Sequence, residues 1–383
     1  MSWNWQQSDW PNFSWDRSRL LKAEAHFLMS AGVFIGTLKH LPRAELEKLT
    51  IEAISTEAVT TSEIEGEMLN RASVQSSIRR QLGLAVDKRR VGPAEEGISE
   101  MMVDLYRSFA APLSDATLFT WHRMLFERRA GLRDIGRYRT GNEPMEIVSG
   151  HLHKPRVHFQ APPSARLPEE MARFLGWFNR TAPSGTDPLP ALTRAGIAHL
   201  YFESIHPFED GNGRIGRAIS EKALAQALGQ ATLTALAATI LLRRKAYYAA
   251  LEAANKSNDV TAWLSWFGGI AIEAQRRTSA NVEFLLEKTR LLDRVRGQIH
   301  PRQEKALLRV FREGADGFKG GLSAGNYATI TGASPATTTR DLADLVEKGI
   351  LLREGERRHA RYHLAITMPN IAPVIIDAQG GFD

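Results

Sequence analysis

Twelve consecutive residues, from His206 to Arg217, hold a histidine, an aspartate followed by glycine, an asparagine and two arginines. These side-chain types suit triphosphate chemistry, because they offer a base, a carboxylate for a metal ion and donors for phosphate oxygens. Upstream, apolar residues at alternating steps of four and three predict a helix that ends at the histidine: Ala191, Ala195, Ala198, Phe202 and Ile205. Downstream, a four-residue repeat closed by glycine predicts a second helix: Ile215, Ile219, Ala223 and Gly229.

Asp210 to Gly213 is therefore expected to be a tight turn that opens onto a helix N-terminus. Gly211 and Gly213 let backbone N–H groups converge on an anion there, and the helix dipole adds positive potential. Arg214 and Arg217 follow at i and i+3, so both guanidinium groups share one helical face and can bind phosphate oxygens together. The sequence thus predicts a phosphate-binding loop with a base beside it.

The same segment meets every fixed position of the pattern His-x-Phe-x-Asp/Glu-Gly-Asn-Gly-Arg-x-x-Arg and so resembles the signature of the Fic family. The alternative is a solvated helix–turn–helix rich in glycine and asparagine, which tolerates this string but does not require it. The resemblance implies a mainly α-helical Fic-fold enzyme. Such an enzyme transfers AMP from ATP to a Ser, Thr or Tyr hydroxyl of a target protein or of itself, with Mg²⁺ or Mn²⁺.

Each polar residue of the segment then has an expected role. His206 is the candidate general base, because imidazole is close to neutral at cellular pH and can accept the proton of the attacking hydroxyl. Asp210 is the expected metal ligand, since one carboxylate and phosphate oxygens usually hold Mg²⁺, and Glu209 is interpreted as its solvated neighbour. Asn212 is expected to bind the α-phosphate, and the two arginines the β- and γ-phosphates.

An earlier motif, Thr61 to Gly66, matches Ser/Thr-x-x-x-Glu-Gly/Asn and resembles the inhibitory helix of the Fic family. The resemblance implies that Glu65 pairs with Arg217, so that ATP binds unproductively and the enzyme is self-inhibited. A carboxylate competes well with an anionic ligand for an arginine. The alternative is an ordinary acidic helix end.

Between Gly136 and Pro163, turn formers and short alternating runs predict a β-hairpin in an otherwise helical region. Its flanks are similar to those of the family's flap. The resemblance implies that residues 147–159 hold the target segment by strand addition, with Val148, Ser149 and Gly150 at the nucleotide site. A plain surface hairpin is the alternative.

Tyr248 and Asn255 lie two helical turns apart and therefore on one face. The family uses a tyrosine and an asparagine in this region around adenine, and this pair is similar. A core tyrosine and a capping asparagine are the alternative. The hairpin histidines lack the spacing and the carboxylates of a metal site and are interpreted as surface residues: His151, His153 and His158.

Composition excludes several classes of protein. The absence of cysteine excludes disulfides, thiolate catalysis and cysteine-based zinc sites. The chain is 43% hydrophobic and 24% charged, with a net charge of +6 and a pI near 9.5, which fits a nucleotide or nucleic-acid partner. No secretory signal and no membrane-spanning run is visible, so a cytoplasmic protein is expected.

Three domains are predicted: N-terminal helices over 1–95, the Fic domain over 112–278 and a winged helix-turn-helix over 298–368. A charged helix over 285–296 is expected to link the last two. Four tryptophans within the first fifteen residues must pack on the following helices or on a second subunit, which leaves a homodimer open: Trp3, Trp5, Trp10 and Trp15.

The predicted winged helix offers DNA binding through residues 334–361, and protein docking or dimerisation is its alternative. The polar residues of its recognition helix are Thr337, Thr338, Thr339 and Arg340, and the arginines of its wing are Arg357, Arg358 and Arg361. Two rival functions stay open for the whole chain. One is removal of AMP, with Glu65 orienting a hydrolytic water, and the other is a DNA-binding regulator whose Fic domain only senses nucleotide. Transfer from another phosphorylated donor is disfavoured by the intact phosphate loop.

Overall fold

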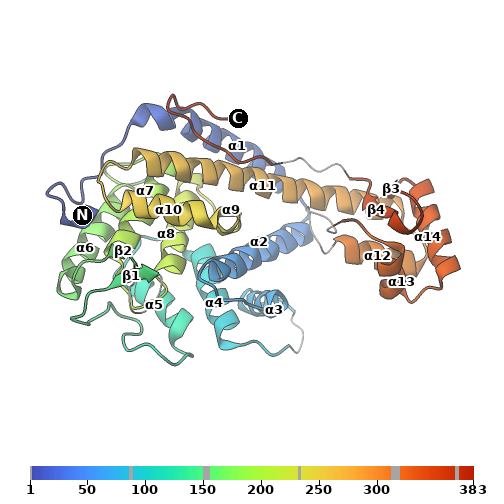
Figure 1. The fold of residues 1–383 in the computed structure, drawn as a ribbon, viewed down its shortest axis with the longest axis horizontal. Coiled ribbons are helices and arrows are strands. Elements are labelled where there is room, and N and C mark those ends of the chain that lie inside the picture. Colours follow the sequence, from blue (N-terminus) through green and yellow to red (C-terminus); the bar gives the residue numbers. More distant parts are fainter. Residues whose placement is uncertain (1, 86–88, 150–155, 232–233, 312–319, 367–370) are drawn as a thin grey trace. The chain divides into compact units, whose positions relative to one another are not determined.

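The computed structural model describes residues 2–85, 89–149, 156–231, 234–311, 320–366 and 371–383. Within these residues the chain forms helices α1 to α14 and two small antiparallel sheets, each of two strands (Figure 1). It divides into two compact units, one of Met1–Gln275 with Ala372–Asp383 and one of Arg276–Ile371. The mainly α-helical class with a small hairpin, predicted from the sequence, is confirmed. None of the helices in the described ranges has the length and apolar character needed to cross a bilayer.

The larger unit opens with five helices: α1 Leu21–Lys39, α2 Arg43–Ile64, α3 Arg71–Gln81, α4 Pro93–Ser108 and α5 Asp115–Phe126. A hairpin follows, β1 Glu146–Ser149 and β2 Arg156–Gln160. The remaining helices are α6 Leu167–Arg180, α7 Ala191–Ile205, α8 Asn212–Leu228, α9 Leu236–Leu242 and α10 Arg244–Ala254. Helix α11, Thr261–Arg294, belongs to the larger unit as far as Gln275 and to the smaller unit from Arg276. The hairpin lies where the sequence predicts it.

Several helix ends follow from local chemistry. The side chains of Asn70 and Ser114 accept the N–H groups of Ser73 and Thr117, which caps α3 and α5. Gly229 ends α8 in the left-handed conformation, as predicted. The charged helix predicted over 285–296 is helical to residue 294, but it is the last part of α11, which begins at Thr261 and runs through unbroken. No glycine or proline interrupts the chain between residues 270 and 294.

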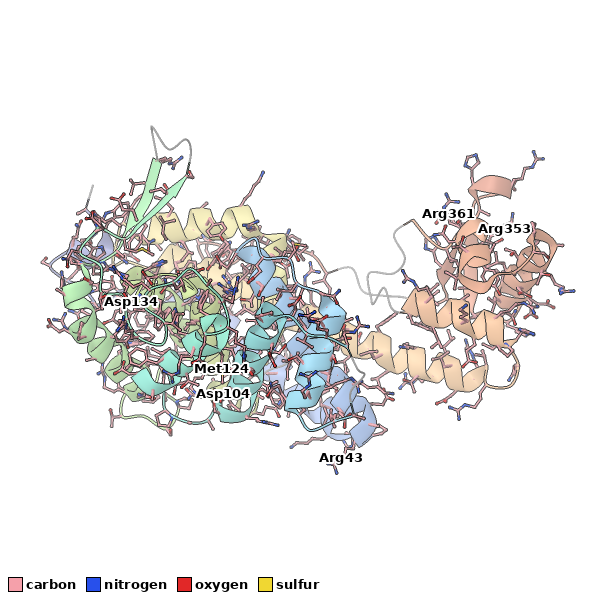
Figure 2. All side chains as sticks on the ribbon, turned by 90° about the horizontal axis from the view of Figure 1, so that it is seen from below. Arg43, Asp104, Met124, Asp134, Arg353 and Arg361 are labelled. Atoms are coloured by element: carbon pink, nitrogen blue, oxygen red, sulfur yellow. The ribbon has the colours of Figure 1, made fainter. Side chains whose placement is uncertain are left out.

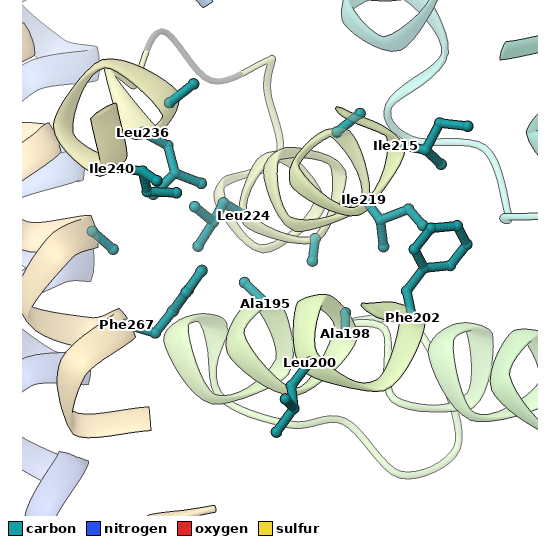
Figure 3. Packing of buried hydrophobic residues seen from close by; sticks show 14 of the residues in the cluster. Ala195, Ala198, Leu200, Phe202, Ile215, Ile219, Leu224, Leu236, Ile240 and Phe267 are labelled. Atoms are coloured by element: carbon teal, nitrogen blue, oxygen red, sulfur yellow. The ribbon is translucent and has the colours of Figure 1, made fainter. Parts of the chain in front are cut away.

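Helix α7 is the centre of the larger unit, and every one of its residues is buried. It packs against α1, α6 and α8, and the rings of Trp263 and Phe267 from α11 stack on its His199. Ala195 and Ala198 present small side chains toward α8, where Ile219 and Leu224 lie (Figure 3). Small residues on the facing surface let the two helices approach closely, which holds both ends of the intervening loop in place.

The N-terminal segment packs on the larger unit of its own chain. Trp10 is buried and its indole N–H donates to Glu170 at 2.9 Å. Trp5 donates to the carbonyl of Gln160 at 2.7 Å, and the Trp3 ring contacts Phe159 edge-on. Of the two surfaces expected to cover these aromatics, the chain's own helices and hairpin therefore do so.

The smaller unit contains α12 Pro301–Phe311, α13 Ala324–Thr331, α14 Pro335–Glu347, β3 Leu351–Glu354 and β4 Arg361–Leu364. Ser334 caps α14 and Pro335 occupies its first turn, as predicted. Leu322 adds a bridge to Tyr362 of β4, with both N–O distances at 2.9 Å. Thr338 lies on the predicted recognition helix, α14, but it is 2% exposed and faces the unit's core, so it cannot contact a ligand there.

Candidate functional site

The loop between α7 and α8 has the predicted form. His206 closes α7 in the left-handed conformation, with φ 50° and ψ 61°, and donates its N–H to the carbonyl of Phe202. Gly211 precedes α8 with φ 82°. A Cβ atom at this glycine would also lie 2.7 Å from the Phe126 ring, so both the backbone angle and the close contact require glycine. The histidine and the N-terminus of α8 thus sit at one turn.

Asn212 holds this loop closed. Its Oδ1 accepts the Phe208 N–H at 3.0 Å, and its Nδ2 donates to the Phe208 carbonyl at 2.9 Å. Its side chain is buried, so it stabilises the loop from inside. The α-phosphate contact expected of Asn212 stays a prediction, and the side-chain amide is already engaged.

Glu209 anchors the loop to the segment before the hairpin. Its Oε2 accepts the backbone N–H groups of Arg133 and Asp134 at 2.8 and 2.7 Å. Asp134 (labelled in Figure 2) is fully buried and accepts both the N–H and the hydroxyl of Thr140. Glu209 is therefore a structural contact, and its interpretation as a solvated neighbour is wrong. Sequence spacing carries no signal for this contact, which joins residues more than seventy positions apart.

A cavity of about 800 Å³ opens at the loop. Most of the residues predicted for nucleotide or metal line it, together with Glu65: Val148, Ser149, His206, Asp210, Gly211, Asn212, Gly213, Tyr248 and Asn255. Gly150 lies outside the described residues. The predicted arginines do not line the cavity, because both turn toward the α2 end.

Arg217 is buried and makes three hydrogen bonds to the end of α2. Its Nε donates to Thr61 Oγ1 at 2.7 Å, and one terminal nitrogen donates to the Thr61 carbonyl at 2.8 Å and to Glu65 Oε1 at 2.7 Å. Burial disfavours its charge, but the Glu65 carboxylate raises the pKa of Arg217. A methyl group added at Gly213 would collide with that carboxylate, so Glu65 lies directly over the phosphate-binding loop.

Arg214 is held in the same way by an acid that the sequence patterns did not single out. Glu67 Oε2 lies 2.8 Å from Arg214, and its Oε1 lies 2.6 Å from Arg129. Gly66, with φ 84°, reverses the chain after α2, and the Glu67 N–H donates back to the Ser62 carbonyl. The only sequence feature that could have indicated this role of Glu67 is its position directly after the helix-ending Gly66.

Burial and charge set the state of the histidine. The His206 ring is nearly enclosed, and Arg139 donates to its backbone carbonyl at 2.9 Å. Burial, with the Arg139 guanidinium nearby, lowers the pKa of His206 to about 4. Glu203 Oε2 lies 3.8 Å from its Nδ1. Burial and the Glu65 carboxylate raise the pKa of Glu203 to about 8, so near neutral pH the imidazole is uncharged and the Glu203 carboxyl is largely protonated.

Tyr248 and Asn255, the pair expected around adenine, both line the cavity, but their side chains differ in exposure. Tyr248 is 43% exposed, and its hydroxyl donates to the Ile64 carbonyl at 3.3 Å. Asn255 caps α10, and its Oδ1 accepts from Ser204 at 3.2 Å. Tyr248 is thus free to present its ring, whereas the Asn255 side chain is engaged in the core.

The hairpin is fastened to α10 beside the cavity. Glu252 accepts from Arg156 at 2.8 Å and pairs with His158 Nδ1 at 2.8 Å. Ile147 and Val148 of β1 remain exposed. Among the described residues no three acidic or histidine side chains gather as a metal site, so His158 is a hairpin residue paired with an acid, while His151 and His153 fall outside those residues.

Two family models match this chain, both within the larger unit. Residues 112–224 match the Fic/DOC family, and residues 3–84 match a domain of unknown function, DUF4172. A solved Fic family protein from Desulfovibrio desulfuricans is similar over 89% of this chain and 95% of its own, at 23% identity and a TM-score of 0.51. A Fic domain containing signaling protein from Bacteroides thetaiotaomicron is similar over 67% and 98%, at 15% identity and a TM-score of 0.49. Fic-1 from C. elegans is similar over 68% and 73%, at 19% identity and a TM-score of 0.48. The first of these likenesses shows the fold.

Proposed function

We propose that this chain, which carries a Fic/DOC family domain at residues 112–224, is a self-inhibited protein adenylyltransferase that moves AMP from ATP to a hydroxyl of a target protein. Members of the family transfer nucleotide-derived groups to proteins. One observation carries the proposal: a neutral, nearly enclosed histidine adjoins an anion-binding loop whose two arginines are both occupied by acids at the end of α2.

In the proposed reaction the target hydroxyl oxygen attacks the α-phosphorus of ATP. The bond from that phosphorus to the pyrophosphate oxygen breaks, and the protein–AMP ester and pyrophosphate are the products. His206 accepts the hydroxyl proton on Nε2, because Nδ1 is the nitrogen turned toward Glu203. The backbone of Gly211 to Gly213 and the freed Arg214 and Arg217 stabilise the phosphates.

The residues fit a divalent cation on one side of the loop. The Asp210 side chain is 57% exposed and lines the cavity, so a carboxylate is available to Mg²⁺ that also binds phosphate oxygens. The ion would neutralise charge on the triphosphate. Asp210 Oδ1 also lies 3.6 Å from Arg214, so the acid adjoins the phosphate-binding arginine.

The end of α2 acts as the brake in this proposal. The Glu65 carboxylate lies over Gly213 and holds Arg217, where the γ-phosphate is expected. While it stays there, the triphosphate cannot align its α-phosphate with the attacking hydroxyl. Loss of near-attack geometry costs orders of magnitude in rate.

The test measures AMP incorporation from α-labelled ATP with Mg²⁺ by purified parent protein and by Glu65→Gly. We expect at least a tenfold increase, which corresponds to about 1.4 kcal/mol of barrier. Glu63→Gly is the matched control, because it places glycine in the same helical turn and removes an acid that does not hold either arginine. His206→Ala in the Glu65→Gly background should abolish incorporation while ATP binding remains. Equal incorporation by parent and Glu65→Gly proteins at every ATP concentration would contradict the brake, and retained transfer in His206→Ala would contradict the base.

A further inference from the structure

The net positive charge of the chain is confined to the smaller unit. Arg276–Ile371 contains 17 lysines and arginines against 11 aspartates and glutamates, a net charge of +6. The whole chain has 49 against 43, so the rest has 32 of each and is neutral. A domain-sized concentration of positive charge is the electrostatic feature of a nucleic-acid-binding surface.

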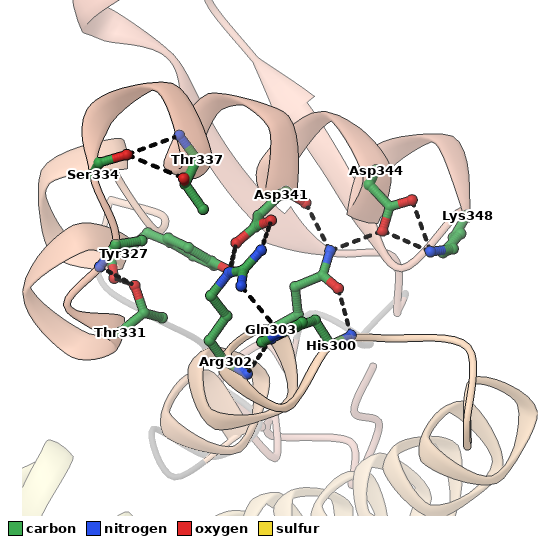
Figure 4. Close-up of polar contacts among 11 residues, drawn as sticks. His300, Arg302, Gln303, Tyr327, Thr331, Ser334, Thr337, Asp341, Asp344 and Lys348 are labelled. Atoms are coloured by element: carbon green, nitrogen blue, oxygen red, sulfur yellow. Dashed lines mark hydrogen bonds and ion pairs between the residues drawn. The ribbon is translucent and has the colours of Figure 1, made fainter.

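Two of the three acids of α14, Asp341 and Asp344, are bound by other side chains of this unit, whereas Glu347 is exposed at the last residue of the helix. Asp341 is buried and receives two hydrogen bonds from Arg302 at 2.5 and 2.9 Å (Figure 4). Asp344 accepts from Gln303 at 2.8 Å and pairs with Lys348 at 2.6 Å. The charge that α14 presents outward in its first two turns is therefore that of Arg340, which is exposed.

The β3–β4 hairpin adds further arginines. Arg353 and Arg357 are exposed, and Figure 2 shows Arg353 and Arg361 on this part of the unit. Among the described residues none of Arg340, Arg353 and Arg357 forms an ion pair, so these guanidinium groups are available to a ligand. The same hairpin also exposes two acids, Glu354 and Glu356, and Glu354 lies 3.4 Å from His363.

We propose that the smaller unit binds double-stranded DNA, with α14 in the major groove and the arginines of the β3–β4 hairpin on the phosphate backbone. The exposed side chains of α14 beside Arg340 are short, Ala336 and Thr339, so the helix can enter a groove about 12 Å wide. A-form RNA has a narrow major groove that a helix cannot enter in this way. This inference does not depend on AMP transfer.

The test titrates the full chain against a fluorescent random-sequence DNA duplex between 50 and 200 mM salt. We expect the logarithm of the association constant to fall linearly with the logarithm of the salt concentration, because phosphate contacts release counterions. The triple variant Arg340→Ala, Arg353→Ala and Arg357→Ala should bind at least tenfold more weakly. The slope of this logarithmic plot should become shallower by about two to three, since each lost phosphate contact reduces it by about one.

The matched control is the double variant Arg290→Ala and Arg296→Ala. These α11-region arginines belong to the same unit, are 73% and 81% exposed, and pair with Glu287 and Asp293 outside the proposed surface. The control should change affinity less than about twofold. No binding at 50 mM salt, equal losses in triple and control variants, or tighter binding to an RNA duplex or a single strand would each overturn the proposal.

Discussion

At the scale of single residues, the chemistry of the site depends on what encloses His206. The ring is nearly enclosed, a guanidinium lies nearby, and the carboxyl beside Nδ1 belongs to Glu203, which burial keeps largely protonated near pH 7. All three features favour the uncharged imidazole. A base that is free of its proton throughout the physiological range suits abstraction of a hydroxyl proton.

The pH dependence of AMP transfer follows from this arrangement. A base works in its unprotonated form, so activity is lost as the pH falls through the pKa of His206, about 4. Removing Glu65, whose charge raises that pKa, shifts the loss further toward acid. In the Glu65→Gly variant we expect kcat/KM to stay level from pH 7 down to about pH 5, with far-UV circular dichroism reporting that the protein is folded. A loss centred near 6.5, the ordinary histidine value, would contradict it.

Glu67 is expected to be a second brake contact, acting on Arg214. In the Glu65→Gly background, Glu67→Ala should lower the KM for ATP about threefold, because Arg214 becomes free for phosphate and the pair it leaves is only partly buried. The measurement is initial-rate AMP incorporation over a range of ATP concentrations.

Substitution of Arg129, the other partner of Glu67, should change the KM for ATP in the opposite direction. Arg129→Ala leaves Glu67 entirely to Arg214, so the KM for ATP should rise. Shifts of the same sign in Glu67→Ala and Arg129→Ala would mean that this cluster only supports the loop.

At the scale of elements, local patterns predicted what short-range physics decides. The helix that ends at His206, the glycine turn and the hairpin over 146–160 all follow from spacing, capping and turn chemistry. The same holds for Ser334 and Pro335 at the start of α14. Elements of this kind are specified by residues within one or two turns of each other.

Contacts between distant segments carried no such signal. Glu209 reaches back to residue 133, and Glu67 reaches across 147 positions to Arg214. The burial of Thr338 depends on how α14 packs against α12 and α13, which its threonine-rich sequence does not specify. The pairing of Glu65 with Arg217 was reached only through the family resemblance, because nothing local links α2 to α8.

The hairpin gives a prediction at this scale. Its fastening to α10 depends on Glu252, which accepts from Arg156 and His158 and whose pKa these contacts lower to about 2. In Glu252→Ala the amides of β1 and β2 should exchange hydrogen at least about threefold faster by mass spectrometry. Glu169→Ala, which breaks an exposed pair with Arg173 on α6, is the control and should leave the hairpin unchanged. Unaltered exchange in Glu252→Ala would show that strand pairing and the contacts of Trp3 and Trp5 hold the hairpin without Glu252.

At the scale of the whole molecule, the two units have separate cores. The cluster that positions the site contains no residue between 276 and 371, and the cluster of the smaller unit runs from Phe284 to Leu351. The site and the proposed DNA surface therefore depend on different buried side chains. This separation predicts that damage to one core leaves the function of the other unit intact.

Leu307 tests that separation, because it is fully buried in the smaller unit. Leu307→Ala should lower the stability of 301–364 by about 2–5 kcal/mol, since it removes buried apolar surface and leaves a cavity. Hydrogen exchange in that segment should accelerate, whereas α7 and α8 keep their protection and the Glu65→Gly variant keeps its rate of AMP transfer. Leu200→Ala, equally buried in α7, should show the reverse pattern. If Leu307→Ala loosens α7 and α8 as much as 301–364, the chain unfolds as one cooperative body and the two functions share a single stability.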